Sequence, residues 1–208
     1  MTSWDPKPYW QVADDMAFCA YRSLFSQVKS RGVYYHTQEV PLFLNYENDI
    51  SETQCCIEYG YQVKSEEKIT APDNLGFCLT ASDYPEIEII SMLPKGYRIK
   101  KLKNNSSYCF DLLNVIRHEI EHVFQEGEFS LKDINLVDYD RSDQNFMLES
   151  KEVPAYVHGF RLSTVSRSNF KKVVRSYINT HGTSLGLTQE EIDKTFNVWL
   201  NYLKNLSF

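Results

Sequence analysis

The sequence predicts an α+β fold in which an N-terminal helix and a small antiparallel sheet precede a helical C-terminal half. Apolar residues recur at helical spacing near both ends of the chain, whereas residues 34–92 carry short runs with the period of β-strands. With 208 residues, 42% of them hydrophobic, the chain is long enough for one well-packed core and too short for several modules. We therefore expect one domain over residues 1–208, made of the halves 1–103 and 104–208.

One helix and four strands are expected in the first half. Apolar residues at helical spacing indicate a helix over Pro8–Lys29, and Gly32 supplies a stop. Short β-rich runs separated by turn residues follow at Val40–Tyr46, Gln54–Val63, Gly76–Thr80 and Glu86–Met92. Polar and apolar residues alternate in the last run, as in a strand with one solvated face, and Pro85 before it suits the start of a strand or an edge strand.

The second half opens with a long helix and a loop. A serine in the polar turn Asn104–Ser107 can cap a helix that runs to about Gln125 and ends near Gly127. The polar segment Glu128–Ser150 predicts a long loop, and loops of this length are usually functional or mobile.

Three further helices complete the predicted fold. They cover Val153–Thr164, Asn169–Thr180 and Gln189–Asn205. Gly182 is expected to close the second of them, and Thr188 and Glu191 have the spacing of a capping box for the third.

Charge and cysteine usage narrow the class of protein. A net charge of −6 disfavours a nucleic-acid-binding surface, and the basic run Lys95–Lys103 is too short to reverse this. No stretch approaches the roughly 18 apolar residues of a membrane-spanning helix, and the first residues lack the features of a secretory signal. Because the five cysteines show no CxxC spacing, we expect reduced thiols. These features predict a soluble cytoplasmic protein without nucleic-acid or membrane partners, and its oligomeric state stays open.

The segment His118-Glu119-Ile120-Glu121-His122 carries the strongest functional signal. Residues four apart on a helix share a face, with Cβ atoms about 5–6 Å apart, so His118 and His122 can direct two imidazoles at one metal ion. Glu119 can then reach a water on that metal without being a ligand. Because Zn²⁺ lowers the pKa of such a water to about 7 and polarises a carbonyl, the pattern predicts peptide hydrolysis with Glu119 as general base.

With its apolar flanks, this segment resembles the active-site helix of the zincin metallopeptidases. The metzincin branch requires Gly three residues after the second histidine, and Gln125 occupies that position. The gluzincin branch takes a glutamate from a later helix. The stretch Glu152-Val153-Pro154-Ala155-Tyr156 resembles the Glu-x-Glu-Ala-Tyr stretch of small bacterial and viral peptidases, with proline in place of the second Glu. The resemblance implies a zincin-like fold, a peptide or protein substrate, and Zn²⁺ held by His118, His122 and Glu152.

Alternatives remain for the third ligand and for the base. Glu149 is the nearest competitor of Glu152, although Pro154 suits a first helical turn and so puts Glu152 at the helix mouth. The histidine segment also satisfies the inverted pattern HxxEH, in which Glu121 would be the base. The third ligand would then be Glu190 or Glu191, which look like capping residues. We therefore keep Glu119 as base and expect Glu121 to be solvated or to support a ligand.

The resemblance also suggests roles outside the ligand set. In zincins an edge strand ahead of the active-site helix binds extended substrate, and Pro85–Met92 has that place in order. Candidates for stabilising an oxyanion are Tyr156, His158, Tyr139 and His181. The rival readings of function are a catalytically inactive zincin-like structural or interaction protein, and an amide hydrolase acting on a cell-wall peptide.

Overall fold

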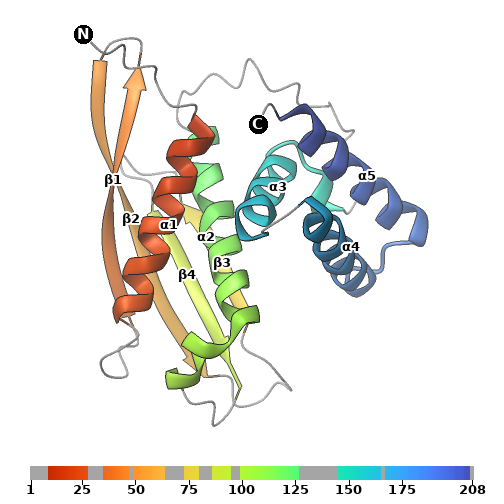
Figure 1. Cartoon of the computed structure of the whole chain (residues 1–208), viewed down its shortest axis with the longest axis horizontal. Coiled ribbons are helices and arrows are strands. Elements are labelled where there is room, and N and C mark those ends of the chain that lie inside the picture. The colour runs from red at the N-terminus through yellow and green to blue at the C-terminus, as the bar shows by residue number, and fades with distance from the viewer. Residues whose placement is uncertain are drawn as a thin grey trace.

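The computed structural model of the chain describes residues 9–27, 35–46, 49–63, 73–79, 86–94, 99–126, 145–164 and 167–206. A sheet lies against two helices, and three further helices follow in the C-terminal part (Figure 1). In chain order the elements are α1 (Tyr9–Gln27), β1 (Tyr35–Tyr46), β2 (Asp49–Val63), β3 (Asp73–Leu79), β4 (Glu86–Leu93), the 3-10 helix η1 (Ile99–Asn104), α2 (Ser106–Glu126), the 3-10 turn η3 (Phe146–Leu148), α3 (Glu152–Ser163), α4 (Arg167–Ser184) and α5 (Gln189–Asn205). The predicted α+β class is confirmed.

The described strands form a mixed sheet with the order β1-β2-β4-β3. β1 pairs antiparallel with β2, and β3 pairs antiparallel with β4, but β2 and β4 run parallel. The expected all-antiparallel sheet is therefore wrong for the central pair, because residue alternation reveals the buried face of a strand and not its neighbour's direction.

The expected edge position of Pro85–Met92 is also wrong, since β4 has a paired strand on each side. Pro85 lies outside the described residues, directly before Glu86, the first paired residue of β4. A proline in front of a strand removes no hydrogen bond from the ladder, so it does not require an edge position. The edge strand next to α2 is β3, whose Gly76 faces Glu119.

One core lies between the sheet and the two helices that cover it (Figure 1). From β4 it takes Ile87, Ile89 and Leu93, from α1 Ala13, Ala17 and Ala20, and from α2 Leu112, Ile116 and Ile120. The small residues of α1 let it approach α2 closely. Asp14 of α1 also bridges Arg117 of α2 (2.8 Å) and Arg161 of α3, so charged contacts tie the three helices together.

A second core holds the C-terminal helices together. Trp199 of α5 is fully buried in it, and its Nε1–H donates to the carbonyl of Met147 at 3.0 Å. Phe160 of α3 and Val174 of α4 pack in the same core. Since Phe110 of α2 packs against this core too, α2 joins the two parts of the molecule.

Helix ends agree with the predictions at three places and differ at two. α3 begins at Glu152 with Pro154 in its first turn, and α5 has the predicted bounds. The predicted capping box of Thr188 and Glu191 is present. The cap of α2 is Asn105, whose Oδ1 accepts the N–H of Tyr108 at 3.1 Å, and not a serine. Both residue types serve because each offers an oxygen on a short side chain.

Gly182 lies inside α4 and does not end it. The helix continues to Ser184 and closes in a Schellman motif, in which Gly186 adopts a φ of 78° and the Leu187 N–H donates to the Gly182 carbonyl at 2.9 Å. A Cβ at Gly182 would lie 2.8 Å from Ile192, so glycine is needed there for the approach of α5.

Further expectations are tested only in part. Residues 128–144 of the predicted loop lie outside the described residues, and its last part forms η3. Cys19, Cys78 and Cys109 carry thiols rather than disulfides, and the side chains of Cys55 and Cys56 are not described. None of the described helices combines the length and apolar character needed to cross a bilayer. The cytoplasmic location stays a prediction.

Candidate metal centre

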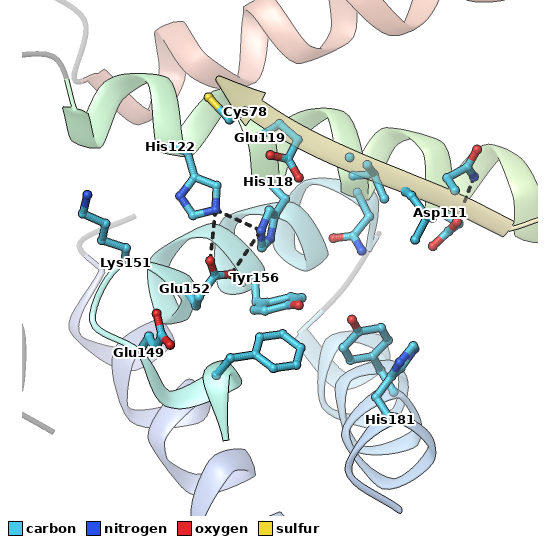
Figure 2. A pocket seen from close by; sticks show the side chains of 17 residues that line it. Cys78, Asp111, His118, Glu119, His122, Glu149, Lys151, Glu152, Tyr156 and His181 are labelled. Atoms are coloured by element: carbon cyan, nitrogen blue, oxygen red, sulfur yellow. Dashed lines mark hydrogen bonds and ion pairs between the residues drawn. The ribbon is translucent and has the colours of Figure 1, made fainter. Parts of the chain in front are cut away.

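The two predicted histidine ligands meet a glutamate from another helix. His118 and His122 lie one turn apart on α2, and their Nε2 atoms are 3.1 Å from each other. Glu152, the first residue of α3, places Oε2 at 3.3 Å from His118 Nε2 and Oε1 at 3.4 Å from His122 Nε2. Figure 2 shows the three side chains turned toward one another at one end of a cavity. Metal ions are held by His, Cys, Asp and Glu side chains. Among the described residues, His118, His122 and Glu152 form the group of such side chains that lie close enough together to hold one.

These separations fit a zinc ion. Zinc bonds to nitrogen and oxygen are about 2.0–2.2 Å long, so its donor atoms lie a little over 3 Å apart. The two Nε2 atoms have such a separation, and each of them lies at a similar distance from a different oxygen of the Glu152 carboxylate. No protein-family model, curated protein or solved structure matches this chain. The chemistry of the centre is therefore inferred from its own residues.

The electrostatics of the three groups also suit a cation. Burial opposes ionisation of Glu152, but hydrogen bonds from His118 and His122 outweigh it and hold the pKa of Glu152 at about 2. Burial disfavours the charged form of His122, yet Glu152 and Gln125 raise the pKa of that imidazole above its ordinary value. Two imidazoles and a carboxylate therefore attract positive charge to the point where they converge, and this donor set is one that zinc accepts.

Gln125 orients one of the candidate ligands, His122. Its Oε1 lies 2.9 Å from His122 Nδ1, and its Nε2–H donates to the carbonyl of Lys151 at 2.8 Å. With the imidazole proton on Nδ1, His122 donates to Gln125 and keeps the Nε2 electron pair for a metal, the arrangement that partners of metal-binding histidines typically impose. Because Lys151 directly precedes Glu152, the same glutamine connects the helix of the histidines to the start of α3.

Glu119 lies beside the three candidate ligands and is not part of their cluster. Its side chain is 6% exposed and lines the cavity next to His118, facing β3 (Figure 2). A Cβ on Gly76 would come 2.5 Å from Glu119 Oε1, so only glycine at that position of β3 leaves room for the carboxylate. Burial raises the pKa of Glu119 above its ordinary value, although His118 and His122 oppose this shift, and a raised pKa is the direction that suits a carboxylate acting as a general base.

The rival third ligand, Glu149, does not join the imidazoles. It is exposed at the end of η3, and its carbonyl accepts the N–H groups of Glu152 and Val153 at 3.0 and 3.1 Å. It therefore helps to start α3 through its backbone, while its carboxylate lies on the cavity wall away from the cluster (Figure 2).

Glu121 is neither solvated nor directed at the histidines. Its side chain is fully buried, where its carboxylate pairs with Arg117 at 2.8 Å and accepts the hydroxyl of Tyr9 at 3.1 Å. Although burial opposes ionisation, the charge and hydrogen bond of Arg117 and the hydrogen bond of Tyr9 hold the pKa of Glu121 below its ordinary value. These partners occupy the carboxylate that the inverted pattern requires as a base, so the expectation of a solvated Glu121 is wrong.

The candidates for oxyanion stabilisation fall in different places. Tyr156 lines the cavity with its ring centroid 4.4 Å from that of His118, and burial together with Tyr177 raises the pKa of its phenol. His181 lines the cavity at the far wall. His158 is fully buried outside the cavity lining, with neither ring nitrogen bonded within the described residues, so it is unsuited to this role. Tyr139 lies outside the described residues.

Proposed function

We propose that this protein is a zinc-dependent metallopeptidase of the gluzincin type. The observation that carries the proposal is the convergence of His118 Nε2, His122 Nε2 and the Glu152 carboxylate at separations suited to tetrahedral zinc. A second carboxylate, that of Glu119, adjoins these ligands in a cavity of about 600 Å³, large enough for part of a peptide.

In this proposal His118, His122 and Glu152 would hold Zn²⁺ beside the cavity. The bound ion supplies Lewis acidity. Glu119 accepts the proton of the attacking water and returns it to the amine nitrogen of the leaving product. Tyr156, whose buried phenol stays neutral, donates a hydrogen bond to the oxygen on which negative charge develops.

The proposed substrate is an extended peptide added to β3. Of the described strands, β3 pairs only with β4, so its other side is open at the cavity, where Asn74, Leu75, Gly76 and Cys78 form part of the wall. Leu75 on the strand and Phe146 on η3 are large apolar side chains, 42% and 40% exposed, that also line this cavity. Backbone pairing with β3 and apolar contact with these two side chains suit a polypeptide. The substrate strand of the zincin resemblance is thus β3 and not β4.

A zincin-like fold is part of the same proposal. Its support is the order of the elements: an edge strand beside α2, two ligands and the base on α2, and the third ligand on the next helix. Ala155 is fully buried near the start of α3, in keeping with the small residue that the gluzincin motif carries there.

Metal content and hydrolysis test the proposal together. Purified protein is expected to bind one equivalent of zinc, to hydrolyse denatured casein, and to lose this activity on chelation and regain it with zinc. Glu119→Gln should retain zinc and lower kcat by about 100-fold or more. Glu152→Gln should lose zinc, whereas Glu149→Gln, the same change in a nearby carboxylate, should retain both zinc and activity.

Three results would contradict the proposal. If the Glu119→Gln protein keeps full activity, Glu119 is not the general base. If Glu152→Gln retains zinc and Glu149→Gln loses it, the third ligand is Glu149 and not Glu152. Stoichiometric zinc without turnover of casein or of peptidoglycan would make the metal structural and favour the non-catalytic alternative.

A further inference from the structure

A second cavity continues the first one past the metal centre. Its volume is about 560 Å³, and it lies between the start of α2 and a long face of α4. The α4 residues that line it are Asn169, Lys172, Val173, Ser176, Tyr177, Thr180 and His181, a stripe with helical spacing. Asp111, Tyr177 and His181 line both cavities, so these three side chains surround the point where the cavities meet.

Asp111 brings a carboxylate to this junction. It precedes His118 by seven residues on α2, which is two helical turns on the same face and about 10.5 Å along the axis. Its Oδ2 accepts the side-chain N–H of Asn74 at 2.8 Å, a contact that joins the edge strand β3 to α2 (Figure 2). The carboxylate is half-buried on the cavity wall, with the metal ligands two turns further along.

Aromatic rings and a second acceptor lie near this carboxylate. The rings of Tyr177 and His181 are 4.0 Å apart between centroids, so the two side chains support each other on α4. Asn114, one turn from Asp111, lines the first cavity at 6% exposure, and its Oδ1 has no hydrogen-bond partner within the described residues. This oxygen lies against Gly159 of α3, so it is directed at the contact between the two helices. A carboxylate and aromatic faces that line one junction favour a cation with N–H donors.

We propose that this junction is a specificity subsite for a positively charged group of the peptide substrate. The inference rests on the proposed peptidase function and adds a substrate class to it. An extended peptide advances about 3.3 Å per residue, so 10.5 Å corresponds to about three residues from the scissile bond. A Lys or Arg side chain reaches Asp111 from two or three residues away. The amino group at the N-terminus of a peptide is also a cation with N–H donors, so it could bind Asp111 in the same way as a Lys side chain. Asp111 and Lys172 both line the second cavity, but only Asp111 also lines the first, so the proposed cation binds where Asp111 faces the first cavity.

Matched peptides test this subsite. Peptides with blocked termini carry Lys or its uncharged analogue norleucine at each of the three positions on either side of the cleaved bond. The zinc-loaded enzyme is expected to prefer Lys at one position by about 10- to 100-fold in kcat/KM, the range for a hydrogen-bonded charge. A further neutral peptide with a free or acetylated N-terminus distinguishes the amino group from the side chain as the source of the cation.

Asp111→Asn separates recognition from structure. The amide oxygen can still accept from Asn74, so the contact between β3 and α2 is kept while the charge is removed. The Lys preference should disappear, and kcat/KM for the norleucine peptide should stay within about twofold. In zinc-loaded Glu119→Gln protein, fluorescence anisotropy should show tighter binding of the Lys peptide, and adding Asp111→Asn should abolish the difference.

Each other outcome overturns the subsite. Equal cleavage of Lys and norleucine peptides by the unaltered enzyme refutes charge recognition while the proposed peptidase function stands. Equal losses for both peptides in Asp111→Asn would make Asp111 a support for β3 only. If the zinc-loaded protein cleaves no peptide of the set and binds none, the subsite and the proposed function fail together.

Discussion

Gly76→Ala tests whether the edge strand sets the position of the proposed base. The added methyl group would lie 2.5 Å from Glu119 Oε1 and 2.7 Å from Val115 Cγ1, whereas ordinary contacts begin near 3.4 Å. Restoring such a contact requires the carboxylate or the strand to move by about 0.9 Å. A displacement of about 1 Å from the reactive geometry can cost about 100-fold in rate. We therefore expect kcat/KM to fall by about 100-fold with zinc still bound, because the atoms nearest to the new methyl group belong to Glu119 and Val115 and not to the proposed metal ligands.

The assay combines peptide hydrolysis with zinc content and thermal unfolding. Gly182→Ala is the matched control: its methyl group would lie 2.8 Å from Ile192, a comparably tight contact inside the helical half. The control should lower stability without lowering kcat/KM per folded molecule. If Gly76→Ala keeps full activity, or if it loses zinc, then Gly76 does not act by making room for Glu119 and the geometric reasoning is refuted.

Two other predictions concern the metal ligands and the buried helix contacts. Gln125→Leu removes the hydrogen bond to His122 and the tie to Lys151, so zinc affinity, measured by competition with a fluorescent chelator, should fall by about 10- to 100-fold. Burial, helped by nearby arginines, lowers the pKa of His158 from 6.5 to about 3 despite the opposing charge of Glu121. The unfolded chain therefore binds more protons between these pH values. The stability that this neutral imidazole contributes is complete above about pH 6.5 and should decline toward pH 3, by up to about 1.4 kcal/mol per pH unit.

Separate controls decide these two predictions. Unaltered zinc affinity in Gln125→Leu would show that His122 is oriented by other contacts. For the pH dependence, urea unfolding of metal-free protein is compared with His158→Phe, since the difference between the two curves cancels the titration of the metal ligands. Parallel curves between pH 4 and 7 would contradict the buried neutral imidazole.

Local patterns were sufficient for the elements and for most of the proposed ligand set. The spacing of apolar residues predicted α2 and α5 closely, since one face of each is buried and the helical period records it. The four-residue separation of His118 and His122 puts both rings on one face of any helix, whatever surrounds it. Pro154 likewise marked the first turn of α3, which leaves Glu152 at the helix end.

These local patterns could not predict contacts between residues that lie far apart in the sequence. No local signal distinguishes Gly76 from a glycine in a turn, because its role depends on Glu119, 43 positions away in the chain. In the sequence, Gln125 indicated only that the glycine of the metzincin motif is missing. In the structure it forms hydrogen bonds with His122 and with the carbonyl of Lys151, the residue before Glu152. The sequence also left Glu121 ambiguous, and its burial with Arg117 and Tyr9 is what separates it from Glu119.

The sequence by itself determined which residues could bind a metal and on which helices they lie, since those properties follow from residue type and a fixed helical rise. The tertiary structure decided which carboxylate meets the imidazoles, which strand borders them, and that Asp111 shares a cavity wall with α4. The physical reason is that strand pairing and helix packing join residues through space. Their choice depends on the total burial and hydrogen bonding of the chain, which no local window of sequence contains.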